Sequence, residues 1–263
     1  MRCKINSCFI FLAGLMFLPG CRTTVNINNP TAEFTAAFQY ASSDSSVEEL
    51  NINNVNGTVE VIGVDSLKSI QLSGQKMVTA QTETEAEDHI GDISIEMDSS
   101  GNIFSVITHQ PNSSGNRNYE VDYKIYVPAR WNVSIENING NVTTTDINND
   151  VGIQVTNGLV ATNNVVGNLV AVLQNGGITT DITTLPPGDT CKLVTTNGQI
   201  ALTIPKSISA AITASVVNGT VSTSTLSITE TSASQTYLAG TIGKGGSLIS
   251  LSAVNGTIQL NGK

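Results

Sequence analysis

The fold is decided by residues 133–160, which read VSIENINGNVTTTDINNDVGIQVTNGLV. This stretch carries one pattern twice: apolar residues alternate with polar ones, an Asn-Gly pair follows, and another apolar residue stands three positions after the Asn. Alternation with a period of two is typical of a β-strand that buries one face. The Asn-Gly pair indicates a sharp turn, because glycine readily adopts the positive φ angles that such turns need.

The same pattern continues in both directions along the chain. Seven Asn-Gly pairs share it: Asn56-Gly57, Asn139-Gly140, Asn157-Gly158, Asn175-Gly176, Asn197-Gly198, Asn218-Gly219 and Asn255-Gly256. From the second pair to the sixth the steps are 18, 18, 22 and 21 residues, and the last step is 37, close to two such steps. A recurrence of about 20 residues is typical of stacked repeat proteins.

Aligning the repeats on the Asn shows which side chains point inward. The columns six and four residues before the Asn, and three after it, hold no polar residue apart from one thiol. The first of these columns contains Leu50, Val133, Val151, Leu169, Cys191, Ile212 and Ile249. The column two before the Asn is mixed, which predicts an inward position near a corner. We interpret Cys191 as a buried small hydrophobe and not as a reactive thiol.

Two all-β architectures remain open at this point. Asn-Gly could join hairpins of a β-sandwich, or it could form the corners of a β-solenoid in which stacked Asn side chains hydrogen-bond between rungs. A sandwich gives no reason for the same register to recur in every repeat, whereas a solenoid requires it. We therefore predict a single-stranded β-helix, or β-solenoid, with Asn-Gly corners every 18–22 residues.

The N-terminus resembles a bacterial lipoprotein leader. Residues 1–20 combine a short basic start with an apolar run that is too short to span a membrane, and Leu18-Pro19-Gly20-Cys21 matches the lipobox. We expect Cys21 to be the first mature residue and the site of lipid attachment; the alternative is an ordinary secretory signal with a chance Cys. Arg22, where Asp would retain such a protein in the inner membrane, favours the outer membrane. Residues 21–33 are then the lipid anchor and tether.

Charge and cysteine content narrow the partners. The whole chain has a formal charge of −9, and the mature chain, without Arg2 and Lys4, has −11. This balance argues against nucleic acid and against electrostatic binding to anionic membranes. Cys3 and Cys8 leave with the signal, so Cys191 remains as the one internal cysteine and no internal disulfide is expected.

We expect one β-solenoid domain over residues 34–263. Residues 34–130 should form irregular N-terminal rungs and 131–263 regular Asn-Gly rungs. In the first part the expected extra strands are 67–73, 92–98, 102–109 and 119–127, with loops at 80–91 and 110–118. At the C-terminus, the rung 250–260 is expected to leave an open edge that permits weak self-association. The alternative is that residues 232–246 fold over that end.

Several motifs also resemble a known family. Val55-Asn56-Gly57, Tyr126-Val127-Pro128 and residues 135–142 (IENINGNV), followed by a train of Asn-Gly rungs, resemble the bacterial "putative adhesin" domain family, which is similar to the head-GIN domain. The resemblance covers about 34–263. It implies a right-handed, single-stranded β-solenoid in a cell-envelope protein. It brings no established catalytic residues with it.

Few residues suggest chemistry. Asp146 and Asp181, with Asn163 between them in the stack, could form a small acidic ladder for acid–base work, but no Arg or Lys is expected in the same register. Solvated turn residues are the simpler interpretation. Rows of threonine such as Thr143–Thr145 suggest the flat face of an ice-binding protein, but Ala161 interrupts the outer column.

The remaining candidates suggest no site either. His89 and His109 lack partners at a useful spacing and are interpreted as surface residues. The acidic run Glu83, Glu85, Glu87 and Asp88 lacks calcium-loop spacing and is interpreted as a solvated loop. We therefore predict no catalytic, cofactor-binding or metal-binding residue.

The function expected from the sequence is a non-catalytic, lipid-anchored envelope protein. Its solenoid surface would serve adhesion, assembly or envelope maintenance. The expected partners are the membrane, through the lipid, and a surface glycan or an envelope protein; no nucleic acid is expected. One alternative is a polysaccharide-acting enzyme on a β-helix scaffold, and another is a sensory or regulatory envelope component.

Overall fold

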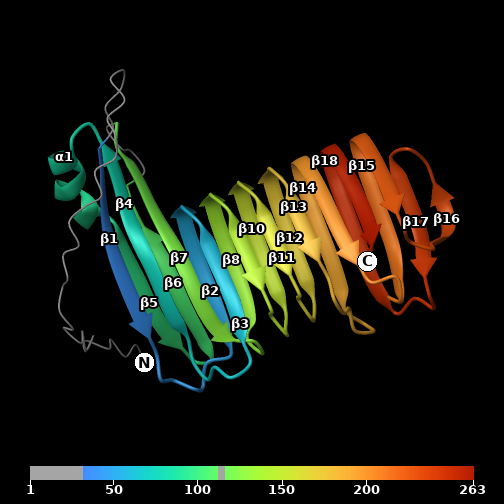
Figure 1. The fold of residues 1–263 in the computed structure, drawn as a ribbon, viewed down its shortest axis with the longest axis horizontal. Helices are drawn as coiled ribbons and strands as arrows, with labels where there is room; N and C mark the ends of the chain where they lie inside the picture. The colour runs from blue at the N-terminus through green and yellow to red at the C-terminus, as the bar shows by residue number, and fades with distance from the viewer. Residues whose placement is uncertain (1–31, 112–115) are drawn as a thin grey trace.

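The computed structural model describes residues 32–111 and 116–263, and it shows a long β-solenoid with the rungs stacked along one axis (Figure 1). The leader, Cys21 and the tether as far as residue 31 lie outside the described residues. Each regular rung gives one strand to each of two facing sheets, and the Asn-Gly pair forms the corner between them. The predicted all-β solenoid is confirmed.

The two sheets share one core and are named here sheet 1 and sheet 2. Sheet 1 contains, in spatial order, β5 (Ser94–Ser100), β6 (Ile103–His109), β2 (Glu49–Asn56), β8 (Asn132–Asn139), β10 (Val151–Asn157), β12 (Leu169–Asn175), the first halves of β14 (Thr190–Ile204), β18 (Ser247–Gly262) and β15 (Ala210–Ser224), then β17 (Tyr237–Ile242) and β16 (Thr229–Ala233). Sheet 2 contains β1 (Ala32–Ala41), β4 (Gln71–Ala80), β7 (Asn118–Pro128), β3 (Val59–Val64), β9 (Val142–Thr145), β11 (Val160–Asn163), β13 (Ile178–Asp181) and the second halves of β14, β18 and β15.

The predicted columns are the core. The residues six and four positions before each Asn, and three positions after it, are buried in nearly every rung. They belong to one hydrophobic cluster. Cys191 is fully buried, and burial raises the pKa of its thiol to about 12. The prediction that Cys191 is buried is confirmed, and the raised pKa disfavours the thiolate, which is the reactive form.

The threonine rows divide between the two faces of sheet 2. Thr144, Thr162 and Thr180 point into the core and are fully buried, and the hydroxyl of Thr162 donates to the hydroxyl of Thr180 at 3.0 Å. Thr179 of the neighbouring column is exposed. Threonine, a small β-branched residue, fits both faces of a strand. Because one threonine column faces the core, the rows do not form the single flat threonine surface considered from the sequence.

The spatial order of the rungs departs from the sequence order at both ends. At the N-terminal end, the rung of β2 and β3 lies between the rung of β6 and β7 and the rung of β8 and β9. At the C-terminal end, β18 lies between β14 and β15 and pairs in parallel with both along its length. The last strand of the chain is therefore an interior rung.

The expectation of an open edge at the final rung is wrong. The outermost parallel rung is β15, and residues 229–242 fold over its end as the antiparallel hairpin β16–β17. The stated alternative, in which a segment before Asn255 covers the end, is closer to the structure. The edge strand β16 is short and exposed, carries Glu230, and has an irregular register, features that discourage pairing with other chains. Weak self-association stays a prediction, but an open edge at the rung 250–260 is no longer its expected cause.

The N-terminal end is closed by antiparallel strands and a small helical segment. The loop expected at 80–91 is largely helical: α1 spans Glu83–Asp88 and η1 spans Ile90–Asp92. Thr82 caps α1, since its hydroxyl accepts a hydrogen bond from the amide of Glu85 at 3.1 Å. Ala86, within the helix, is buried. The strand expected at 67–73 lies at 71–80, as β4.

Candidate functional site

The Asn-Gly corners form one continuous ladder along an edge of the solenoid. In each step the side-chain Nδ2 of one Asn donates to the Oδ1 of the next, at 2.7–2.9 Å, in the order Asn218, Asn255, Asn197, Asn175, Asn157, Asn139 and Asn56. Asn56 completes the ladder by donating to the carbonyl of Tyr119 at 2.9 Å. All seven amides point the same way, so each hydrogen bond polarises the next.

Glycine is required at these corners for two reasons. All seven glycines have positive φ angles between 122° and 153°. A Cβ atom on Gly158 would also lie 2.1 Å from the carbonyl oxygen of Gly140 in the preceding rung, and the same collision recurs at the other corners. The predicted positive φ angles and the predicted Asn stacking are both confirmed.

A groove runs beside this ladder on the outer face of sheet 1. It has a volume of about 550 Å³ and crosses β6, β2, β8, β10, β12 and β14. The residues three positions and one position before each corner Asn form the walls of the groove. The residues two positions before each corner Asn form its floor. Six strands at a spacing of about 4.8 Å give the groove a length of roughly 24 Å along the solenoid axis.

The groove is lined by uncharged polar groups and apolar groups, with one carboxylate. Its lining residues are Asn53, Asn54, Val55, Thr108, Glu136, Asn137, Ile138, Gln154, Val155, Thr156, Val172, Leu173, Gln174 and Thr196. None of these lining residues is basic or aromatic, and one is acidic. Ile138 and Val172 are 47% and 39% exposed, so they add apolar surface to the groove walls.

Two asparagines at the groove floor replace the apolar residues of later rungs. The Nδ2 atoms of Asn54 and Asn137 donate to the carbonyls of Val121 and Gly57, at 3.2 and 3.1 Å. Their Oδ1 atoms are buried and have no hydrogen-bond partner within the described residues. Both side chains are buried, so their polar groups lie beneath the floor at this end of the groove and not on its accessible surface.

The opposite edge of the solenoid does not form the acidic ladder considered from the sequence. Asp181 is in register with Asn163, whereas Asp146 lies one position further on, where Asn164 donates to it at 2.7 Å. The residues in register with Asp181 are Asn163, Thr203, Asn261 and Ser224, so the expectation that no basic residue shares this register is confirmed. The ammonium of Lys263, two residues beyond Asn261, nevertheless contacts Asp181. The chain terminus returns to this edge through β18, which sequence spacing did not reveal.

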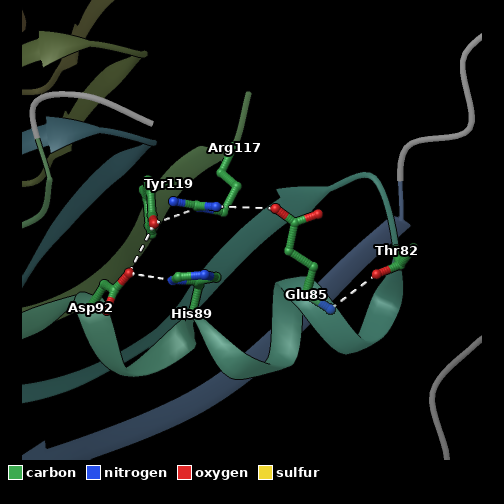
Figure 2. A network of polar contacts seen from close by, with 6 residues as sticks. All are labelled: Thr82, Glu85, His89, Asp92, Arg117 and Tyr119. Atoms are coloured by element: carbon green, nitrogen blue, oxygen red, sulfur yellow. Dashed lines mark hydrogen bonds and ion pairs between the residues drawn. The ribbon is translucent and has the colours of Figure 1, made fainter. Parts of the chain in front are cut away.

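A polar network joins the helical segment to β7 at the N-terminal end (Figure 2). Arg117 donates to Glu85 at 3.0 Å and to the Tyr119 hydroxyl at 3.1 Å. Asp92 then accepts from Tyr119 at 3.0 Å and lies 2.7 Å from Nδ1 of His89. Two hydrogen bonds hold the pKa of the Asp92 carboxyl below the ordinary value of 3.8. The bond with His89 has the larger effect and the bond with Tyr119 the smaller one.

This network makes the helical segment sensitive to acid. Because the folded pKa of Asp92 lies below its unfolded value, its contribution to stability is complete above 3.8 and is lost as pH falls through the folded pKa. We expect hydrogen-exchange protection of α1, corrected for intrinsic rates, to fall over that range before the central rungs open. Asp92→Asn should weaken α1 at neutral pH and remove this pH dependence. An unchanged profile in the variant would show that another group is responsible.

The other sequence candidates lie apart from the groove. The exposed His109, the last residue of β6, pairs with Glu96 of β5 at 3.2 Å. The acidic run forms the helix α1 instead of a loop. Within the residues that the structure describes, no three His, Cys, Asp or Glu side chains gather closely enough to hold a metal ion. Over the same residues, no helix is both long enough and apolar enough to cross a membrane.

Sequence reasoning missed the groove. Its signal was the outward pair of columns three and one before the Asn, which alternate with the core columns and hold amides, threonines and valines. The exposed Val172 and Ile138 did not single the groove out, because Val170 and Leu248, which lie outside it, are exposed as well.

These features define a β-solenoid repeat protein with an amide ladder and a neighbouring groove. The profile of the family described as Toastrack DUF4097 matches residues 40–261, so the chain belongs to this family. The family resemblance predicted from the Asn-Gly rungs is confirmed.

Solved structures give more distant likenesses. The chain is similar to a "putative cell adhesion protein" from Clostridium sporogenes, with 14% identity, 88% of this chain and 100% of that chain covered, and a TM-score of 0.49. It is also similar to a "putative adhesin" from Bacteroides fragilis, with 11% identity, 86% and 97% covered, and a TM-score of 0.31. No curated protein matches the chain.

Proposed function

We propose that this chain is a non-catalytic, lipid-anchored protein of the cell envelope, and that its groove binds an extended, uncharged glycan. The observation that carries the proposal is the groove itself, which crosses six strands and presents new side chains at every rung. Binding of this kind serves adhesion, assembly or envelope maintenance without a chemical step.

The shape of the groove favours a linear polymer. Because the rungs repeat at about 4.8 Å, a chain lying along the axis meets the same pair of columns again at each step. A peptide strand usually adds to a sheet edge, where backbone groups are free. Here the groove crosses the middle of the sheet, whose backbone groups are paired, so its side chains must make the contacts.

The chemistry of the lining favours hydroxyl groups. Asn53, Gln154 and Gln174 offer amides that both donate and accept, and Thr156 and Thr196 offer hydroxyls. Val172 and Ile138 provide apolar surface for the ring faces of sugars. The lining has no basic group to attract phosphate or sulfate, and the chain has a formal charge of −9, so anionic polymers are disfavoured.

Binding should depend on the groove amides. Replacing Gln154 and Gln174 together by Ala should weaken binding on an array of neutral glycans by roughly tenfold, since each lost hydrogen bond costs about 0.5–1.5 kcal/mol. The matched control replaces Gln199 and Gln259, two exposed glutamines outside the groove, by Ala. Equal binding by both double variants would overturn the site, and cleavage of the bound glycan would favour the enzyme alternative.

Anchoring should depend on Cys21. The Cys21→Ser variant should move from the membrane fraction to the soluble fraction and should remain unprocessed, because the lipid cannot be attached. Cell fractionation and the mass of the N-terminal peptide measure this. Retention in membranes with normal cleavage would contradict the lipoprotein assignment without affecting the groove.

A further inference from the structure

The inner corners of the ladder are closed to backbone chemistry. In four successive corners the glycine amide donates to the Asn carbonyl of the next rung, at 2.8–3.1 Å: Gly57 to Asn139, Gly140 to Asn157, Gly158 to Asn175 and Gly176 to Asn197. In the same corners the Asn side chain donates to one neighbour and accepts from the other. Neither the amide nitrogen nor the side chain can move without breaking the ladder.

The corner of β15 differs because it is the last in the stack. Asn218 donates to Asn255 at 2.8 Å, but no described residue donates to its own Oδ1. By the geometry of the inner corners, the amide of Gly219 points away from β18, and no described residue there accepts from it. The hairpin contacts this strand on either side, where Val216 and Val221 donate to Thr236 and Gln235 at 2.9 Å. The corner between them stays uncovered, and Val217 is 69% exposed.

An uncovered Asn-Gly pair can rearrange without an enzyme. The glycine nitrogen, after losing its proton to water or hydroxide, attacks Cγ of the Asn; the new C–N bond forms, the Cγ–Nδ2 bond breaks, and ammonia leaves. Water then opens the resulting succinimide at either carbonyl, and the products are aspartate and isoaspartate. Glycine favours the attack because it has no Cβ to hinder it.

We propose that Asn218-Gly219 is the deamidation site of this ladder, while its other six Asn-Gly pairs are protected. The product removes the amide that donates to Asn255 and places a carboxylate against that residue's Oδ1, so two acceptors face each other. The isoaspartate form also lengthens the backbone by one carbon, which disturbs the register of β15 on β18. Modification should therefore loosen the outermost rung and the hairpin, and leave the groove in sheet 1 intact.

Peptide mapping of the whole protein after prolonged incubation in mildly alkaline buffer tests this proposal. Isoaspartate should accumulate at Asn218 at least about tenfold faster than at Asn157. Deamidation at an inner rung requires a larger local unfolding of the solenoid than deamidation at the outermost rung. In denaturing urea the seven pairs should react at similar rates, because the ladder is gone. An eighth pair, Asn261-Gly262, is not a ladder member; its amide donates to the Thr225 hydroxyl at 3.2 Å, and it is left out of the comparison.

Variants separate exposure from sequence. Asn218→Gln should abolish isoaspartate at this corner and leave the remaining sites unchanged, and Asn218→Asp should lower the hydrogen-exchange protection of β17 as the aged protein does. Similar rates at all seven pairs in the folded protein, or a faster reaction at an inner pair, would overturn the proposal.

Discussion

Truncation of the chain after Gly246 will unfold the C-terminal rungs instead of removing one of them. The deleted strand β18 lies between β14 and β15 and pairs with both, so its loss separates β15 and the hairpin from the rest of the solenoid. It also removes the four large buried side chains of β18, Ile249, Leu251, Ile258 and Leu260. At about 1.5–3 kcal/mol each these contribute roughly 6–12 kcal/mol, comparable to the whole stability of a typical domain.

The measurement is hydrogen exchange by mass spectrometry, with thermal unfolding beside it. Protection should disappear from residues 205–246 and weaken in β14, while the rungs of β8 to β11 keep theirs. Truncation after Leu260 is the control, because it keeps the core residues of β18 and removes only its last ladder positions, the hydrogen bonds of Gly262 with Thr225 and the exposed ion pair of Lys263 with Asp181. An exposed ion pair is worth at most about 1 kcal/mol. If β15 moved in to pair directly with β14 and protection persisted, the interior rung would be dispensable and the prediction wrong.

A single methyl group at an inner corner should have the next largest effect. Gly158→Ala places a Cβ 2.1 Å from the carbonyl oxygen of Gly140, at a φ angle of +152°. Strain at such an angle costs about 1–3 kcal/mol, and forced overpacking costs a further 1–3 kcal/mol, so we expect a loss of roughly 2–6 kcal/mol. The damage should spread to adjoining rungs, since each rung is stabilised by its neighbours.

The strand that leads into this corner contains the matched control. Gly152 lies six residues earlier in β10, and a Cβ there meets no atom within 4 Å. Gly152→Ala should therefore be neutral or stabilise by up to about 1 kcal/mol, because it restricts the unfolded chain. Chemical denaturation of both variants decides the matter. Equal stability of the two would mean that the corner backbone relaxes freely.

The sequence predicted what each rung is, because a rung is a local object. Alternating apolar residues before the Asn give a strand, and the pair itself gives the corner and the amide ladder. Cys191 could be placed in the core from its column alone. These inferences needed no knowledge of which rung lies beside which.

The order of the rungs could not be predicted for the same reason. Every corner offers the same Asn and the same glycine. Asn255 therefore fits the position between Asn197 and Asn218 as well as a position beyond Asn218 at the end of the stack. Which arrangement forms depends on the connections and on the hairpin of residues 229–242, whose covering of β15 is a tertiary contact. The contact of Lys263 with Asp181 follows from that order and was missed with it.

The groove and the helix were missed for different reasons. The groove is lined by residues of six strands whose side-by-side order, with β2 between β6 and β8, sequence columns do not give. The helix was readable from Thr82 and Glu85, which have capping-box spacing. It was passed over because a segment of six residues shows no apolar stripe.

The interior position of β18 determines how the molecule would bear tension. A strand at the edge of a sheet can be peeled away, and its hydrogen bonds then break one after another. Because β18 is paired along both sides from Leu248 to Asn261, a pull on the C-terminus along the strand loads two ladders of bonds together, in shear. A protein held to a surface at one end and to a ligand along its side would resist extraction of its last strand, and would yield first at the antiparallel strands that close its two ends.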